Sequence, residues 1–185
     1  MQWWYVGVLA AVAAQRLREL SISRRNSRTV AGALPSAPRA YPLIVAAHLA
    51  LFVLPPLEIR LARRRSPPPL ALAWLGVLAA ATALRWWSIR SLGESWNVRA
   101  EVPADLEPVT SGPYRFLRHP NYLALVIEFV ALPMAGGAWL SALGLAALNG
   151  AALAIRIRAE EALLERSAAY REAFRGKSRL IPGVF

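Results

Sequence analysis

The chain has 185 residues, 56% of them hydrophobic and only 18% charged, which excludes an ordinary soluble domain because such a domain carries more charge. The formal charge of +11 comes almost wholly from arginine, since Lys177 is the only lysine, and the absence of cysteine excludes disulfides, thiolate metal sites and a cysteine nucleophile. Nucleic-acid binding is the usual alternative for so basic a chain, but here the arginines stand between apolar runs. We therefore predict a small polytopic membrane protein with no nucleic-acid partner.

Five apolar segments come close to the length that a membrane-spanning helix needs, which is about 20 residues, with about 17 as a lower limit. They run from Trp3 to Leu20, from Tyr41 to Leu57, from Pro69 to Ile89, from Asn121 to Met134 and from Trp139 to Ile155. The fold class that follows is an all-α integral membrane protein with about five transmembrane helices. Pro133, Gly136 and Gly137 end the fourth segment, so we expect the last two spans to form a tight hairpin.

The connections differ in character. Loops are predicted over Ser21–Ala40, Arg60–Pro69 and Arg90–Arg118. After Ile155 the chain becomes charged while apolar residues keep a helical period, which predicts an amphipathic helix that leaves the bilayer and ends before Gly176. We expect this C-terminal helix to be cytosolic.

Charge alone does not fix the orientation, because both early loops are basic. If the Arg90–Arg118 loop and the C-terminal helix are cytosolic, Ser21–Ala40 joins them and the arginines of 60–65 face outward, against the positive-inside tendency. The supply of a cytosolic cofactor favours this arrangement all the same. We therefore expect a protein of the bacterial inner (plasma) membrane with its active site facing the cytosol.

The segment Gly112–Tyr122, G-P-Y-R-F-L-R-H-P-N-Y, places two arginines, a histidine, an asparagine and three aromatic rings directly before an apolar run. Pro120 suits the first turn of a helix, where its missing N–H is not needed. Arg118 and His119 then lie at the positive end of that helix, a favourable place for a carboxylate or phosphate. Alternatively, Arg118, His119 and Tyr122 are ordinary side chains that anchor the helix at the membrane interface.

The predicted hairpin returns the chain to the side that it left, so Arg156, Glu160 and Glu161 should lie near His119 and Asn121. One patch would then combine cations, carboxylates and aromatic rings. Such a patch suits an adenine-containing cofactor with a positive sulfonium, which aromatic faces and carboxylates stabilise. Arg156 and Glu160 are also spaced as a simple helical ion pair.

The C-terminal half, from about Leu84 to Pro182, resembles the isoprenylcysteine carboxyl methyltransferase family, whose wider group includes the membrane phospholipid methyltransferases. The resemblance rests on an ordered set: T-S-G-P-Y-R-F-L-R-H-P-N-Y, R-I-R-A-E-E-A-L-L, Tyr170 and a closing R-L-I-P. R-H-P-x-Y alone is less specific, because some membrane sterol reductases carry a similar stretch. The N-terminal R-L-R-E-L-S-I-S-R-R-N and Y-P-L-I-V-A-A-H resemble bacterial members, some associated with methylating alkylpyrones or alkylresorcinols.

This resemblance implies S-adenosylmethionine as the cofactor, enclosed between the R-H-P-x-Y segment and the Glu-Glu helix. Carried onto this sequence, the cofactor-binding residues are Tyr114, Arg118, His119, Pro120, Tyr122 and Glu160, and the catalytic candidates are Glu161, Arg156 and His119. We expect one methyltransferase domain over residues 1–185, with three spans in 1–89 and the cofactor-binding loop, hairpin and C-terminal helix in 90–185.

The sequence indicates the residues that bind the methyl acceptor less clearly than those that bind the cofactor. Glu128 lies in the fourth segment, and intramembrane carboxylates usually face a cavity or a partner. Glu128 is interpreted either as a base or hydrogen-bond acceptor for the substrate or as a structural partner of Asn149 or His48. Trp87, Trp96 and Asn97 are candidates for the substrate entrance or for interfacial anchors. No His/Asp/Glu spacing suggests a metal site.

The function that follows is methyl transfer from S-adenosylmethionine to an oxygen, whether carboxylate, phenol or enol, of a lipophilic acceptor at the membrane. The acceptor is prenylcysteine-like or alkylpyrone- or alkylresorcinol-like. The alternatives are an NADPH-dependent membrane reductase of the sterol type, a phospholipid N-methyltransferase and a non-catalytic scaffold. Membrane lipids are the expected surroundings, and the small residues on the spans are compatible with a homodimer.

Overall fold

The computed structural model describes residues 3–29, 34–35, 40–98, 101–102 and 107–181. Its long helices are α1 (Trp3–Thr29), α2 (Tyr41–Leu61), α3 (Pro68–Leu92), α4 (Pro120–Gly136) and α5 (Trp139–Leu164). The shorter elements are the 3-10 turns η1 (Gly93–Ser95) and η2 (Gly112–Arg115), the helix α6 (Ala168–Ala173), and the strands β1 (Leu34–Pro35) and β2 (Glu101–Val102). The predicted all-helical architecture is confirmed in outline, and the added two-stranded ribbon pairs Leu34 with Val102.

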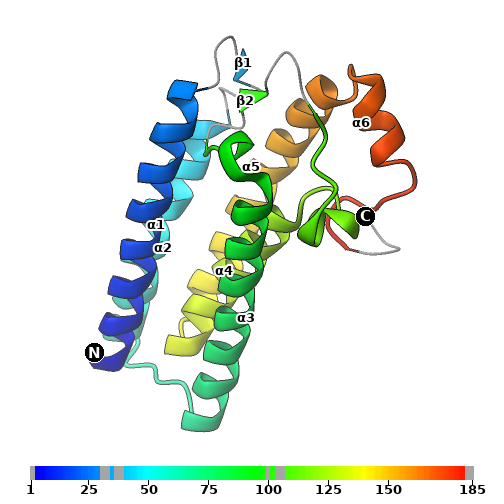
Figure 1. Ribbon diagram of the computed structural model, residues 1–185. Coiled ribbons are helices and arrows are strands. Elements are labelled where there is room, and N and C mark those ends of the chain that lie inside the picture. Colours follow the sequence, from blue (N-terminus) through cyan, green and yellow to red (C-terminus); the bar gives the residue numbers. More distant parts are fainter. Residues whose placement is uncertain (1–2, 30–33, 36–39, 99–100, 103–106, 182–185) are drawn as a thin grey trace.

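The long helices form one elongated bundle, and the connections gather at its two ends (Figure 1). The N-terminus and the α2–α3 connection lie at one end, and α6 lies at the other. We call these the N-terminal end and the α6 end. α4 packs along α3 and α5, and α5 also packs along α2. Buried apolar residues fill the space between the helices, including Tyr5, Leu51, Phe129, Leu132 and Leu145.

Three helices are long and apolar enough to cross a membrane: α2, α3 with the turn that follows it, and α5. Large apolar side chains also point away from the bundle, among them Leu49, Leu72 and Leu143, which are 64–68% exposed. Outward leucines of this kind suit contact with lipid and not with water. α4 is apolar but shorter, and α1 does not meet the same criterion, so five spans stay a prediction.

The predicted loop Ser21–Ala40 is wrong over its first part, because α1 continues to Thr29. The apolar run ends near Leu20, and the prediction places the end of the helix at the same residue. However, Ser21–Thr29 contains neither glycine nor proline, and arginine favours helix almost as strongly as leucine. The segment therefore stays helical after its apolar face has ended.

The C-terminal helix also differs from the prediction. α5 runs without interruption from Trp139 through the charged stretch to Leu164, so the residues after Ile155 extend a long helix. The chain then turns at residues 165–167, and the hydroxyl of Ser167 accepts the N–H of Tyr170 at 3.3 Å to cap α6. The helical structure ends before Gly176, as predicted.

α4 and α5 are joined by only two residues, Gly137 and Ala138. Gly137 has a φ of +89°, the left-handed conformation that often ends a helix, and its N–H bonds to the carbonyl of Met134 at 3.0 Å. Glu58 of α2 then accepts the backbone N–H groups of Leu140 and Ser141 at 3.2 and 2.7 Å. This carboxylate satisfies the first turn of α5 and places that helix against α2.

Candidate functional site

The start of α4 is built as the sequence predicts. Pro120 is the first residue of the helix and His119 is its N-cap. The carbonyl of His119 accepts the N–H groups of Tyr122 and Leu123 at 3.0 and 3.2 Å. Proline suits this position because its fixed φ is helical and no N–H is required of it. The side chains of residues 119 and 122 are thereby fixed at the α6 end of the bundle.

A C-terminal strap, residues 177–179, runs beside the residues that precede α4. The backbone N–H groups of Arg118 and His119 donate to the carbonyls of Ser178 and Arg179, both at 3.0 Å. The guanidinium of Arg118 donates to the carbonyl of Lys177 at 2.9 Å, and the Lys177 ammonium donates to the carbonyl of Tyr114 at 3.1 Å. The strap therefore fixes the backbone of the R-H-P segment from a position about 60 residues away.

Glu161 is the centre of an ionic cluster. Its carboxylate accepts from the guanidinium of Arg179 at 2.7 Å and lies 3.3 Å from the imidazole Nε2 of His119. The guanidinium of Arg118 lies 3.6 Å away. Glu161 is only 3% exposed, so its charge is neutralised inside the protein by groups from the R-H-P segment and the strap. The geometry makes Glu161 the connection between α5, the start of α4 and the C-terminus.

Tyr122, Arg156 and Glu160 form a second cluster. The Arg156 Nε donates to the Tyr122 hydroxyl at 2.8 Å, and that hydroxyl donates to the carboxylate of Glu160. The predicted pairing of Arg156 with Glu160 is therefore mediated by the tyrosine. The rings of Tyr122 and His119 are stacked with centroids 5.3 Å apart, which joins the two clusters.

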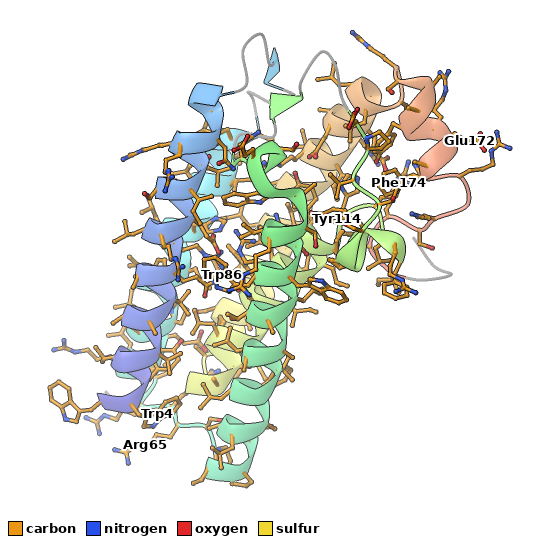
Figure 2. All side chains as sticks on the ribbon, viewed as in Figure 1. Trp4, Arg65, Trp86, Tyr114, Glu172 and Phe174 are labelled. Atoms are coloured by element: carbon orange, nitrogen blue, oxygen red, sulfur yellow. The ribbon has the colours of Figure 1, made fainter. Side chains whose placement is uncertain are left out.

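A cavity opens beside these clusters between α3, α4, α5 and α6. Its wall combines charged, polar and aromatic side chains: Leu92, Ser95, Trp96, Asn97, Glu107, Pro108, Val109, Tyr114, Arg118, His119, Asn121, Tyr122, Glu160, Leu164, Tyr170 and Phe174. Tyr114 and Phe174 lie close together at this end of the molecule, in one apolar cluster with Leu164 and Tyr170 (Figure 2). A tyrosine phenol is already neutral near pH 7, and burial raises the pKa of Tyr114 and Tyr170 further.

Gly112 allows the turn that carries Tyr114 to approach α3. Its φ is +59°, and a Cβ on this residue would lie 2.1 Å from the hydroxyl oxygen of Ser91 and 3.0 Å from Nε1 of Trp87. A larger side chain fits there only if the Ser91 side chain or the turn moves, and the positive φ disfavours it in addition. The turn η2 therefore lies against α3 and places Tyr114, which is 6% exposed, in the cavity wall.

The extended end of α1 holds another part of the wall. Asn26 donates through its side-chain amide to the carbonyls of Gly93 and Trp96, at 3.0 and 2.6 Å. The hydroxyl of Ser23 accepts the N–H of Val98 at 3.0 Å. Trp96 is 3% exposed and lines the cavity. The helical turns that the sequence analysis assigned to a loop thus support the segment after α3.

A third polar cluster lies within the bundle and reaches the cavity through Asn121. Arg85 of α3 donates to both carboxylate oxygens of Glu19 of α1, at 2.7 and 2.8 Å, and to the amide oxygen of Asn121 at 3.2 Å. Arg16 of α1 pairs with Glu19 at 2.7 Å and with Glu128 of α4. The sequence offered Asn149 or His48 as structural partners of Glu128; the structure gives it Arg16 instead.

The structure thus brings most of the predicted residues together. Tyr114, Arg118, His119, Tyr122 and Glu160 line the cavity, as do the two substrate candidates Trp96 and Asn97. The other predicted residues do not line the cavity. Glu161 and Arg156 contact His119 and Tyr122, which do line it, and Pro120 begins α4. Glu128 lies in the cluster inside the bundle, and Trp87 is 49% exposed on α3.

Several cavity residues had been given no role in the site, notably Asn121, Leu164, Tyr170 and Phe174. The sequence carried a signal for Tyr170 and Phe174, because residues four apart lie on one face of a helix. Asn121 was visible as part of R-H-P-N-Y, but its partner Arg85 lies 36 residues earlier and no local pattern connects them. Among the described residues, no group of three His, Asp or Glu side chains is placed to hold a metal ion.

Comparison with known proteins gives a family for this arrangement. Residues 74–166, half of the chain, match the model of the isoprenylcysteine carboxyl methyltransferase family. The match runs from within α3 to just past the end of α5, so it contains the residues of both clusters except Arg179 of the strap. It begins earlier than the predicted limit at Leu84 and ends before Tyr170, and Pro182 lies outside the described residues.

Two curated bacterial proteins are similar over nearly the whole chain. A Bacillus subtilis (strain 168) protein, described as "Uncharacterized protein YpbQ", is 29% identical over 170 residues, which are 89% of this chain and 97% of that protein. A Haemophilus influenzae protein, described as "Uncharacterized protein", is 28% identical over 158 residues, which are 84% of this chain and 91% of that protein. The likeness therefore covers a larger share of the chain than the family match does.

Proposed function

The chain belongs to the isoprenylcysteine carboxyl methyltransferase family, and on that premise we propose that it transfers a methyl group from S-adenosylmethionine to an oxygen of a lipophilic acceptor. Membership makes it a membrane methyltransferase, and the apolar helices make it an integral membrane protein. The observation that carries the finer proposal is the cavity at the α6 end, which joins aromatic faces, a carboxylate and a guanidinium within the matched segment.

The chemistry of the wall fits the cofactor. Tyr114, Tyr170 and Phe174 offer apolar ring faces for an adenine, and the Glu160 carboxylate offers an acceptor for hydroxyl groups or a favourable charge for a sulfonium. The Arg118 guanidinium is a donor for a carboxylate. When bound, S-adenosylmethionine supplies a methyl group that already sits on a good leaving group.

The residues of this chain then have mainly to align the acceptor and to exclude water. A carboxylate acceptor is ionised at neutral pH and needs no general base. A phenol or enol needs one, and the candidates are Glu160, Glu161 and His119. Of these, Glu160 lines the cavity, whereas Glu161 is engaged with Arg179 and His119. We therefore assign Glu161 to holding His119 and Arg118 in position, and Glu160 to the contact with the bound molecules.

The test is isothermal titration of the purified protein with S-adenosylmethionine and S-adenosylhomocysteine, in detergent and in lipid nanodiscs. We expect saturable binding with one site per chain. Tyr122→Phe removes the hydroxyl between Arg156 and Glu160 and should weaken binding about tenfold, the usual effect of a lost hydrogen bond to a charged group.

Tyr5→Phe is the matched control, because it removes the hydroxyl of another buried tyrosine, bonded to the Leu132 carbonyl at 3.1 Å at the N-terminal end of the bundle. Its affinity should equal that of the unmodified protein. Well-folded protein that binds neither ligand in either medium would contradict the methyltransferase proposal. Binding and turnover of NADPH with an enone would support a reductase in its place.

A further inference from the structure

Asn121 differs from the other polar residues of the cavity, because its amide is oriented from inside the bundle. Its Oδ1 accepts from the Arg85 guanidinium at 3.2 Å. A guanidinium can only donate, so the oxygen of the amide must be the atom that faces Arg85, and the NH₂ group faces the other way. In the described part of the chain this NH₂ has no protein partner and is not a buried atom, while Asn121 itself lines the cavity.

Arg85 is held firmly enough to impose this orientation. It is 4% exposed, and its two bonds to Glu19, which is 1% exposed, form the parallel pair that gives arginine–carboxylate contacts their fixed geometry. Glu19 is supported in turn by Arg16 and by the amide of Gln15 at 3.0 Å. The donor direction of Asn121 is therefore set by residues of α1 and α3.

The charges of this cluster cancel. Arg16 and Arg85 are matched by Glu19 and Glu128, so the cluster has no net charge with which to attract an anion from a distance. What it supplies to the cavity is an oriented N–H donor at the start of α4, where the helix also presents its positive end. Such a donor is satisfied by an oxygen with lone pairs, and it repels a protonated amine.

We propose that the Asn121 NH₂ group binds the oxygen of the methyl acceptor, and that the Glu19–Arg85 pair is the positioning device for it. The acceptor oxygen is the one that the proposed function already names. This inference rests on the proposed function and adds the residues that hold its acceptor. The oxygen would contribute the electron pair of the new C–O bond, while the methyl–sulfur bond of S-adenosylmethionine would break and leave its electron pair on the sulfur of S-adenosylhomocysteine. A carboxylate has no proton to lose, whereas a phenol or enol must first give its proton to a base. Asn121 forms no covalent bond.

The experiment compares hexadecanoic acid, 5-pentadecylresorcinol and hexadecylamine as methyl acceptors of the full-length protein in nanodiscs. We expect methylation of at least one of the oxygen probes and none of the amine at pH 7. Asn121→Asp keeps the shape and the contact with Arg85 but replaces the donor by an acceptor. It should raise the KM for the oxygen probe about tenfold or more, while the Kd for S-adenosylhomocysteine stays within about threefold.

The role of Arg85 is tested with Arg85→Lys, which keeps the charge but has no fork with which to hold Glu19 and Asn121 together. A positioning role predicts a higher KM for the oxygen probe, and it predicts that Asn121→Asp adds little further loss when it is combined with Arg85→Lys. A purely structural role predicts a lower unfolding temperature with the KM unchanged and with both effects additive.

The outcomes separate this inference from the proposed function. If neither S-adenosylmethionine nor S-adenosylhomocysteine binds, both fail. If the cofactor binds, the inference alone is overturned by methylation of the amine as efficient as that of the oxygen probes, by methylation of neither oxygen probe, or by an unchanged KM in Asn121→Asp.

Discussion

At the scale of single residues, two adjacent carboxylates of α5 have different surroundings. Glu160 lines the cavity and accepts from the Tyr122 hydroxyl, whereas Glu161 is buried against Arg179 and His119. Successive residues of an α-helix point about 100° apart, because a turn takes about 3.6 residues, so one of two neighbours can face a cavity while the other faces a packed interior. We expect their substitutions to separate binding from stability.

Glu160→Gln should weaken the binding of S-adenosylhomocysteine about tenfold with the thermal unfolding midpoint nearly unchanged. Glu161→Gln should lower the free energy of unfolding by about 2 kcal/mol, less than for a fully buried ion pair because Arg179 is 42% exposed. Calorimetry and thermal unfolding in the same detergent measure the two effects. Glu172→Gln, on the exposed side of α6, is the control and should change neither. Equal loss of stability in both variants would argue against separate roles.

At the scale of elements, the turn η2 depends on its close contact with α3. Gly112 and Gly93 both have positive φ, +59° and +55°, but only Gly112 has atoms of another segment where a Cβ would be. The two glycines therefore share the backbone strain that a side chain would cause and differ in the collision with Ser91. They form a matched pair for testing whether the position of η2 governs the cavity.

Gly93→Ala should cost about 1–3 kcal/mol of unfolding free energy, the range for a residue in an unfavourable conformation. Gly112→Ala should cost more, because a Cβ there collides with Ser91, and it should also weaken S-adenosylhomocysteine binding if the collision pushes η2 and Tyr114 away from α3. Chemical unfolding and calorimetry test this. If Gly112→Ala binds as tightly as Gly93→Ala, the close approach of η2 is not needed for the site.

At the scale of the whole molecule, the cavity lies at the α6 end, and the arginines after α2 lie at the N-terminal end (Figures 1 and 2). Figure 2 places Arg65 and Trp4 at that end, far from Tyr114 and Phe174. A basic cluster at the end away from the cavity conflicts with a cytosolic active site under the positive-inside tendency. We keep the proposal of a cytosolic cavity, because S-adenosylmethionine is supplied from the cytosol, and its test is direct.

The chain has no native cysteine, so single-cysteine labelling is unambiguous. Ala62→Cys follows α2 at the N-terminal end, and Ala169→Cys lies on the exposed side of α6. Neither changes a charge. In intact bacteria a membrane-impermeant maleimide should label Ala62→Cys at once and Ala169→Cys only after permeabilisation. The reverse pattern would place the cavity outside the cytosol.

The helices and the chemistry of the R-H-P-N-Y segment follow from local patterns in the sequence. Apolar runs, Pro120 and the glycines after α4 act locally, so the segments predicted for α2, α3 and α4 agree with the structure to within a few residues. The errors at the ends of α1 and α5 came from taking the end of an apolar run as the end of a helix. Backbone hydrogen bonds and arginine propensity continue a helix after its apolar face has ended.

Which groups meet depends on the packing of the helices. Arg85 pairs with Glu19 66 residues earlier, Arg16 pairs with Glu128 112 residues later, and Arg118 and His119 are fixed by the strap. No spacing rule relates such positions, because the rotation of each helix about its axis is set by the packing of all its neighbours. That rotation brings Glu160 to the cavity, turns Glu161 away from it, and gives Asn121 its orientation.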